Sequence, residues 1–281
     1  MKIFKTKPLY LAWKNNLGTT KTIGFVPTMG ALHSGHLSLI EQSKGECDFT
    51  VCSIFVNPTQ FNNAEDFEKY PVTTKLDLQL LEKIGCDAVF LPTVEEMYPN
   101  NEKVEHFDFS PFDVSMEGSY RPGHFDGVGT IVGKLFEAIE PDISFFGQKD
   151  FQQLKVIEKL VEIKNYHTKI VGCPIVREDD GLAMSSRNKR LSDEHRKKAV
   201  FIYQVLKNAK QQAISHNVSE IKNWVIDAFS KEEEFELDYF EIASERDLQP
   251  TSSLKSETKP RAFIAAFLGG VRLIDNLALN G

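Results

Sequence analysis

Short apolar runs, rich in β-branched residues, alternate with longer amphipathic stretches between residues 22 and 176. This alternation is typical of strands joined by crossover helices in a parallel sheet. The predicted strands span residues 22–26, 49–56, 88–91, 143–146 and 170–176. Between them, apolar residues at helical spacing over 76–84 and 128–139 predict helices that cover the sheet.

The pattern changes after residue 176. A charged helical stretch over 193–216 and a second helix over 219–229 precede alternating strands at 235–242 and 262–274, with a hairpin turn predicted at Gly269-Gly270. We therefore expect an α/β protein, with a Rossmann-like parallel-sheet domain over 1–176 and a smaller α+β C-terminal domain over 177–281. The segment 111–126, rich in Gly, Pro and polar residues, predicts a long surface loop and a candidate lid.

Composition narrows the class of protein. The 281 residues are 41% hydrophobic and 26% charged, which is typical of a water-soluble globular chain. No apolar run approaches the roughly 20 residues of a membrane span, and the first residues lack a signal peptide. The four cysteines have no C-x-x-C spacing, which predicts reduced packing thiols and a cytoplasmic protein. A net charge of -7 argues against a nucleic-acid partner.

Two histidines follow the first predicted strand of the sheet. The loop reads PTMGALHSGH over residues 27–36, and a helix is predicted from about Leu37. Glycine lets backbone approach a ligand, and a helix N-terminus attracts anions, so His33 and His36 are candidates to stabilise charge on phosphate. Two alternatives are surface polar residues at a helix start and a zinc site. A zinc site is disfavoured because no nearby Cys or carboxylate completes the ligand set.

A second candidate stretch lies just past the last predicted strand of the sheet. Short hydroxyls beside an arginine are able to clamp phosphate, because the guanidinium offers a planar fork of donors. The alternative is that serine only caps a helix here. The residues of this stretch are Met184, Ser185, Ser186 and Arg187.

Further polar candidates follow other strands. Lys149, in the stretch FGQKD after the strand at 143–146, is a candidate to neutralise phosphate, the alternative being a solvated lysine at a helix start. Gln60 and Gln153 are usually surface residue types. Near strand ends, however, an uncharged amide holds a carboxylate without quenching its nucleophilicity, so both are candidates for binding an acid substrate.

Taken together, these motifs resemble a known superfamily. The histidine loop and the Met184 stretch look like the HIGH-type and KMSKS-type pair of nucleotidyltransferases, which cleave ATP between the α and β phosphates. More narrowly, the chain over about 22–191 resembles the pantoate–β-alanine ligase family. The stretches that carry this resemblance, in order, are PTMGALHSGH, FVNPTQF, RPGHFDGV, FFGQKDFQQL and MSSRN.

The resemblance implies a pantoyl-adenylate intermediate, the release of pyrophosphate and AMP, and a homodimer. It implies that Gln60 and Gln153 bind pantoate and that Gln60 also lies near β-alanine. It implies catalytic roles for His36, His33, Lys149, Ser185, Ser186 and Arg187. The ATP-binding residues that it implies are Met29, Gly30, Ala31, Leu32, His33, Ser34, Gly35, His36, Gly147, Gln148, Lys149, Asp150, Val176, Met184, Ser185, Ser186 and Arg187.

The resemblance is incomplete around Asp77. Some relatives have acidic and amide residues there that assist Mg²⁺, whereas Leu76 and Leu80 flank Asp77 here. We therefore expect no protein ligand to metal and expect Mg²⁺ to be carried on the phosphates.

Three other functions compete with the ligase. A related adenylyltransferase would transfer AMP to a phosphate, but two glutamines in place of an arginine cluster favour a carboxylate substrate. An aminoacyl-tRNA synthetase would need a basic RNA-binding surface. A non-catalytic nucleotide-binding module would be expected to lack one of the histidines or the lysine.

Overall fold

The computed structural model describes residues 1–61 and 64–280. The chain divides into two compact units, each described by itself below. Unit 1 comprises Met1–Phe109, Arg121–Gln148 and Gln153–Pro174. Unit 2 comprises Ser110–Tyr120, Lys149–Gln152 and Ile175–Gly281.

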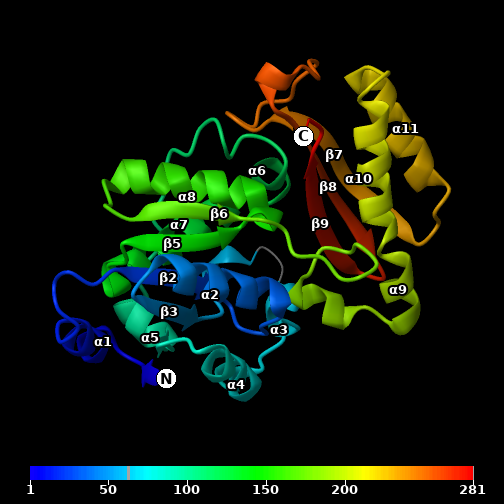
Figure 1. The fold of residues 1–281 in the computed structure, drawn as a ribbon. Helices are drawn as coiled ribbons and strands as arrows, with labels where there is room; N and C mark the ends of the chain where they lie inside the picture. Colours follow the sequence, from blue (N-terminus) through cyan, green and yellow to red (C-terminus); the bar gives the residue numbers. More distant parts are fainter. Residues whose placement is uncertain (62–63, 281) are drawn as a thin grey trace. The chain divides into compact units, whose positions relative to one another are not determined.

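Unit 1 is built on a six-stranded parallel sheet with the strand order β1-β4-β3-β2-β5-β6. Figure 1 labels β3, β2, β5 and β6 of this sheet. The predicted parallel α/β architecture is therefore confirmed. The strands are β1 (Lys2–Phe4), β2 (Ile23–Thr28), β3 (Phe49–Ile54), β4 (Ala88–Phe90), β5 (Ile143–Gly147) and β6 (Lys169–Cys173). Strand β1 was not predicted, because three largely exposed residues are too short to show a hydrophobic period.

Helices cover both faces of this sheet. Consecutive side chains of a strand point to opposite faces. Val26 packs in a core with Ile40 and Leu81, whereas its neighbour Phe25 contacts the ring of Phe136. Helices α2 and α4 therefore lie on one face and α7 on the other. Up to residue 164, the α-helices other than α6 are α1 (Lys7–Lys14), α2 (Ser34–Glu46), α3 (Ala64–Glu68), α4 (Thr74–Ile84), α5 (Val94–Met97), α7 (His124–Ile139) and α8 (Phe151–Lys164).

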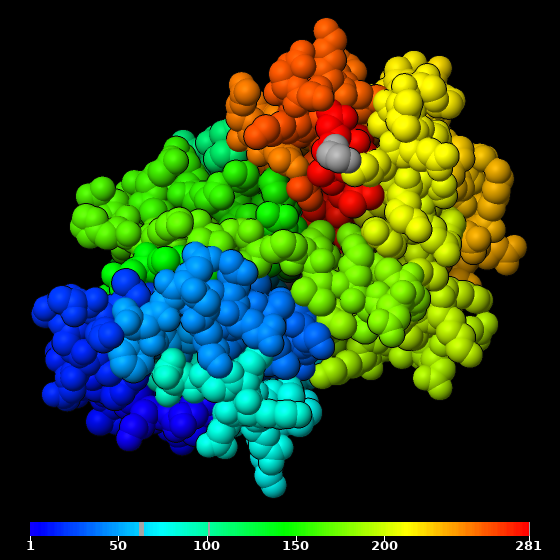
Figure 2. Space-filling model, in the orientation of Figure 1, coloured from blue at the N-terminus to red at the C-terminus, as the bar shows by residue number. Residues whose placement is uncertain are grey.

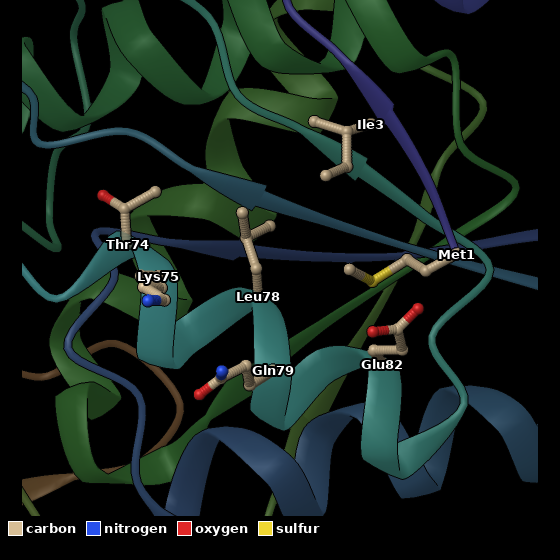
Figure 3. Close-up of a pocket in the computed structure, with 7 residues that line it drawn as sticks. All are labelled: Met1, Ile3, Thr74, Lys75, Leu78, Gln79 and Glu82. Atoms are coloured by element: carbon tan, nitrogen blue, oxygen red, sulfur yellow. The ribbon is translucent and has the colours of Figure 1, made fainter.

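A hollow of about 520 Å³ lies between the edge strand β1 and helix α4. Its apolar lining includes Ile3 and Leu78, and Met1 and Glu82 also border it (Figure 3). None of the residues that line it is a predicted site residue.

Unit 2 packs two helices on a three-stranded antiparallel sheet, in the order β7-β8-β9. Its core includes Ile202, Leu206, Val225 and Ile264. The outer sides of α10 and α11 form much of its visible surface (yellow and gold in Figure 2). The elements are α6 (Glu117–Tyr120), α9 (Asp193–Lys198), α10 (Phe201–Gln212), α11 (Val218–Ser230), β7 (Phe235–Ser244), β8 (Pro260–Leu268) and β9 (Val271–Ala278).

The predicted hairpin turn is confirmed. Gly269 and Gly270 connect β8 and β9 with φ angles of 57° and 75°. A two-residue turn with positive φ at both positions matches the twist of an antiparallel pair, and glycine adopts it without a Cβ penalty. The last two strands of the smaller α+β unit thus form a β-hairpin.

Several predicted boundaries are wrong. The helix over 193–216 is two helices, separated at Ala199, where Ile202 N–H donates to the Ala199 carbonyl and tightens the turn. The strand over 170–176 ends at Cys173 because a proline follows, and the strand over 49–56 ends at Ile54.

The predicted surface loop over 111–126 is also partly wrong. It contains α6 and the start of α7, and Glu117 is only 6% exposed. Both Glu117 carboxylate oxygens accept hydrogen bonds of 2.8 Å from the Arg272 guanidinium, which also pairs with Asp238. Tyr239 Oη donates to Glu117 at 2.8 Å, and burial together with this carboxylate raises the pKa of Tyr239. The segment is therefore tied to β7 and β9.

Two further expectations concern membranes and thiols. Within residues 1–61 and 64–280, no helix is both long and apolar enough to span a bilayer.

The four cysteines are free, and Cys52, Cys86 and Cys173 are buried, as expected of packing residues. Burial raises the pKa of Cys86 to about 12 and that of Cys47 to about 11, so these thiols stay protonated near neutrality.

Candidate functional site

The histidine loop (residues 27–36) joins the carboxyl end of β2 to the N-terminus of α2. Gly30 and Ala31 both have left-handed backbone, with φ of 78° and 50°, which turns the chain sharply. His33 is the N-cap residue of α2, and the ring centroids of His33 and His36 lie 4.1 Å apart. Both side chains are half-buried. The local fold therefore brings two imidazoles close together, tilted by 37° to each other, at one helix start.

The N-terminus of α2 suits an anion. Among the described residues, the His33 side chain makes no capping hydrogen bond, and the first turn of α2 contains no acidic residue. The helix dipole and the first-turn amides therefore favour negative charge beside the imidazoles. The amides of Ala31 and Leu32 do not contribute, because both donate to Asp77, at 3.0 and 2.8 Å.

Gln60 lies next to the histidine loop. It ends the 3₁₀ turn Pro58–Gln60, which follows β3, the neighbour of β2 in the sheet. Its Nε2 donates to Met29 Sδ at 3.2 Å, and its carbonyl oxygen contacts His124 Nδ1 at 2.9 Å. The ends of two adjacent strands thus place a glutamine amide beside Met29.

Asn57 was missed by the sequence analysis. It is 1% exposed, and its Nδ2 donates to Gln60 Oε1 and to the Gly127 carbonyl, both at 3.2 Å. Tyr98 Oη donates to Asn57 Oδ1 at 2.8 Å. Asn57 therefore fixes the orientation of the Gln60 amide. The available signal was its position directly after a buried strand, within the same FVNPTQF stretch as Gln60.

Helix α7 approaches the Gln60 turn closely at a glycine. A Cβ on Gly127 would lie 2.6 Å from the Thr59 carbonyl oxygen and 2.9 Å from Gln60 Cα. Such distances are well inside van der Waals contact, so only glycine fits without movement. The lack of a side chain at Gly127 consequently determines how closely the turn that carries Gln60 packs against α7.

The other predicted residues of unit 1 lie near the ends of β5 and β6. Gly147 ends β5, and a Cβ there would meet no atom within 4 Å. Gln148 Nε2 donates to the Gly172 carbonyl at 3.2 Å. Gln153 is half-buried in the first turn of α8.

In unit 2, the Lys149 main chain is held by the last strand. Its carbonyl accepts a 2.8 Å hydrogen bond from Asn276 Nδ2. The Lys149 ammonium is 3.7 Å from the Asp150 carboxylate, and the lysine side chain is only 16% exposed. Beside Asn276, the buried Asp275 pairs with Arg177 at 2.6 and 3.0 Å, and burial raises the pKa of Asp275.

The Met184 stretch leads into a 3₁₀ turn, η4 (Ser186–Arg190), with Ser185 as its N-cap residue. Ser185 Oγ accepts the Arg187 N–H at 3.3 Å, so Ser185 caps this turn, as the alternative interpretation anticipated. Ser186 is 5% exposed, and Met184 N–H donates to the Val176 carbonyl at 3.0 Å. Backbone hydrogen bonds therefore hold both ends of this stretch.

The predicted site residues fall into two sets. In unit 1 the structure joins His33 to His36 and Met29 to Gln60 by direct contacts, with Gly147, Gln148 and Gln153 in the same unit. In unit 2 it joins Met184 to Val176 and Ser185 to Arg187. The remaining members of that second set are Lys149, Asp150 and Ser186.

Within residues 1–61 and 64–280, a resident metal has no obvious set of ligands. In the part of the chain that the structure describes, no group of three or more His, Cys, Asp or Glu side chains is arranged to hold a metal ion. Both carboxylate oxygens of Asp77 already accept backbone amides. The donors here therefore suit an anion better than a bare cation.

Comparisons with known proteins identify the family of this chain. A family model described as pantoate-beta-alanine ligase matches residues 2–278. The chain is 49% identical over 282 residues to the pantothenate synthetase of Christiangramia forsetii, covering 100% of both chains. It is 51% identical over 257 residues to that of Bacteroides thetaiotaomicron, covering 92% of this chain and 91% of the relative.

Solved structures extend the likeness to the fold. The pantothenate synthetase of Thermus thermophilus superposes with a TM-score of 0.93 at 39% identity over 100% of both chains. The pantoate-beta-alanine ligase of Francisella tularensis, complexed with beta-gamma ATP and beta-alanine, gives a TM-score of 0.84 at 36% identity, covering 99% of this chain and 98% of that one. The chain belongs to the pantoate-beta-alanine ligase family.

Proposed function

We propose that this chain condenses pantoate with β-alanine at the expense of ATP. In the first half-reaction a pantoate carboxylate oxygen attacks the α-phosphorus of ATP, forming pantoyl adenylate as pyrophosphate leaves. In the second, the β-alanine amine attacks the acyl carbon, and AMP leaves with the electrons of the broken C–O bond as the amine loses a proton. Pantothenate, AMP and pyrophosphate are the products.

The paired imidazoles at the start of α2 carry this proposal. In the first half-reaction, negative charge builds on the α-phosphate and the departing pyrophosphate. The rings of His33 and His36, with centroids 4.1 Å apart at the N-terminus of α2, offer N–H donors beside a positive dipole end. We assign both to the ATP phosphates and His36 to proton donation.

The remaining phosphate contacts are assigned to unit 2. The Lys149 ammonium and the Arg187 guanidinium supply cationic donors, and Ser185 and Ser186 supply hydroxyls. The Ser185 cap of η4 holds the main chain of Arg187 in place. The other residues assigned to ATP are Met29, Gly30, Ala31, Leu32, Ser34, Gly35, Gly147, Gln148, Asp150, Val176 and Met184.

The acid substrate is assigned to two glutamines. Gln60 and Gln153 hold pantoate, and Gln60 lies near the β-alanine position. An amide donor orients a carboxylate while leaving its charge available for attack, whereas a bidentate guanidinium would reduce its nucleophilicity. Asn57 supports this role because its side-chain amide donates to Gln60 Oε1, which fixes the orientation of the Gln60 side-chain amide.

The proposal also covers where Mg²⁺ binds, how many subunits assemble and in which compartment the protein works. We place Mg²⁺ on the ATP phosphates, where it neutralises charge, and not on Asp77, whose oxygens are engaged. A homodimer in the cytoplasm is proposed from the family resemblance, and four free cysteines without a disulfide suit a reducing compartment.

A two-stage assay tests the function. With ATP and pantoate, labelled pyrophosphate should exchange into ATP, and AMP should accumulate only when β-alanine is added. Omitting pantoate should abolish the exchange. Equal exchange with and without pantoate would remove the acid from the first step and overturn the proposal. Supplying a phosphorylated acceptor in place of pantoate tests the competing adenylyltransferase.

Gly127→Ala should weaken pantoate binding. The added Cβ would press on the Thr59 carbonyl and Gln60 Cα, so the turn that carries Gln60 must shift. A displacement of this kind should raise KM for pantoate about tenfold or more, with a smaller effect on KM for ATP. Steady-state kinetics with each substrate varied in turn will measure both constants.

Gly45→Ala in α2 is the matched control. A Cβ there meets no atom within 4 Å, and alanine favours helix, so KM for pantoate should be unchanged. A Gly127→Ala variant with the pantoate KM of the unmodified chain would show that the turn does not position Gln60 for this substrate.

A further inference from the structure

The carboxylate of Asp77 contacts the histidine loop directly, although it lies far from it in the sequence. Asp77 is in the first turn of α4 and is 1% exposed. Its Oδ2 accepts the Ala31 N–H at 3.0 Å, and its Oδ1 accepts the Leu32 N–H at 2.8 Å. One side chain thus holds two consecutive amides of the loop.

The surroundings of Asp77 compensate its burial. A buried carboxylate is costly unless hydrogen bonds replace its hydration. Besides the two amides, Thr73 Oγ1 donates to Asp77 Oδ1 at 3.1 Å. The N-terminus of α4 also favours a negative charge in its first turn. The carboxylate is therefore stabilised by the loop and by the start of its own helix.

The backbone conformation of the histidine loop at Ala31 needs stabilising contacts of this kind. Ala31 is fully buried with φ of 50°, a region that residues with a Cβ rarely adopt unless their surroundings impose it. The two amides bound by Asp77 belong to the peptides on either side of Ala31. Fixing both peptides fixes φ and ψ of Ala31, and two residues later the chain reaches His33 at the start of α2.

We propose that Asp77 is a positioning residue for ATP. By fixing the backbone on both sides of Ala31, it sets where α2 begins and where the rings of His33 and His36 lie. Asp77 acts through this backbone and does not bind metal. The inference rests on the proposed function, which assigns these rings to the ATP phosphates.

Asp77→Asn is the principal test. Asparagine keeps the shape but offers one acceptor oxygen in place of two, so one loop amide loses its partner. We expect kcat/KM for ATP in pantoate-dependent exchange to fall about 10- to 100-fold, since misplacement of about 1 Å has effects of this size. KM for pantoate and the half-saturating Mg²⁺ concentration should stay close to those of the unmodified chain, and Asp77→Ala should lose more than Asp77→Asn.

Asp87→Asn is the matched control. Its Oδ2 also accepts a backbone amide, from Thr50 at 2.8 Å, in the same unit. It lies before β4, at the amino ends of the strands and away from the histidine loop. The same chemical change at this position should leave kcat/KM for ATP nearly unaltered.

Two results would overturn the inference: an unchanged ATP response in a folded Asp77→Asn variant, or a shifted Mg²⁺ requirement, which would make Asp77 a metal ligand. Amide hydrogen exchange of the unmodified chain gives a test that needs no variant. The Ala31 and Leu32 amides should be protected, and rapid exchange would refute their bonds to Asp77. If the unmodified chain itself lacks pantoate-dependent exchange, the proposed function fails, whereas a normal Asp77→Asn beside an active parent defeats only this inference.

Discussion

His36→Ala should lower the rate of pantoyl-adenylate formation by about 100- to 1000-fold, the usual consequence of removing one donor from a developing oxyanion. The His36 ring lies 4.1 Å from that of His33 at the start of α2. Removing it takes away an imidazole donor, and His33 alone cannot supply both the phosphate contact and the proton assigned to His36. The fold should persist, because His36 is only half-buried.

Pyrophosphate exchange, supported by circular dichroism to verify folding, will measure this loss. His167→Ala is the matched control, since His167 is an exposed histidine of the same unit and should tolerate the change. The loss should appear in kcat more than in KM for pantoate, because the interaction strengthens in the transition state. Near-normal exchange by His36→Ala would exclude His36 from the chemistry.

Arg272→Ala should reduce the free energy of unfolding by about 3–5 kcal/mol, as expected when one partner of a buried ion pair is removed. Arg272 bonds both oxygens of Glu117 and also pairs with Asp238. The side chains of Glu117 and Asp238 are only 8% and 16% exposed. Without the guanidinium, two carboxylates remain close together in a poorly solvated position.

Urea unfolding followed by circular dichroism will test this value. Lys231→Ala provides the comparison in the same unit, because its ion pair with Asp227 is exposed and should contribute well under about 1 kcal/mol. If the two variants had the same free energy of unfolding, the bonds of Arg272 to Glu117 and Asp238 would not anchor the segment that contains α6.

The parts of the fold that the sequence predicts correctly depend on local pattern. Strands β2 and β3 form where buried β-branched runs occur, and the Gly269-Gly270 turn forms because glycine adopts positive φ at both positions without a Cβ penalty. The fold class, the family and its reaction follow from motifs of this local kind. Helix α7 was predicted to begin too late because glycines such as Gly127, which permit close packing here, look like loop residues in a sequence.

The features that sequence reasoning missed depend on partners far apart in the chain. Asn57 is recognisable as a support for Gln60 only once Tyr98 and Gly127 surround it. Glu117 lies in a stretch with the composition of a loop, and its partner Arg272 is 155 residues away. No local period encodes such pairings, so burial and hydrogen bonding in the folded chain are needed to find them.

The hydrogen bond from Asn276 to the Lys149 carbonyl has a consequence for biosynthesis. Translation proceeds from the N-terminus, so Lys149 leaves the ribosome long before Asn276 is made. The lysine therefore lacks its main-chain tether until β9 has emerged and paired with β8. A nonsense codon ahead of β9 would yield a truncated polypeptide whose parallel sheet is complete in sequence, yet whose Lys149 carbonyl lacks the hydrogen bond from Asn276.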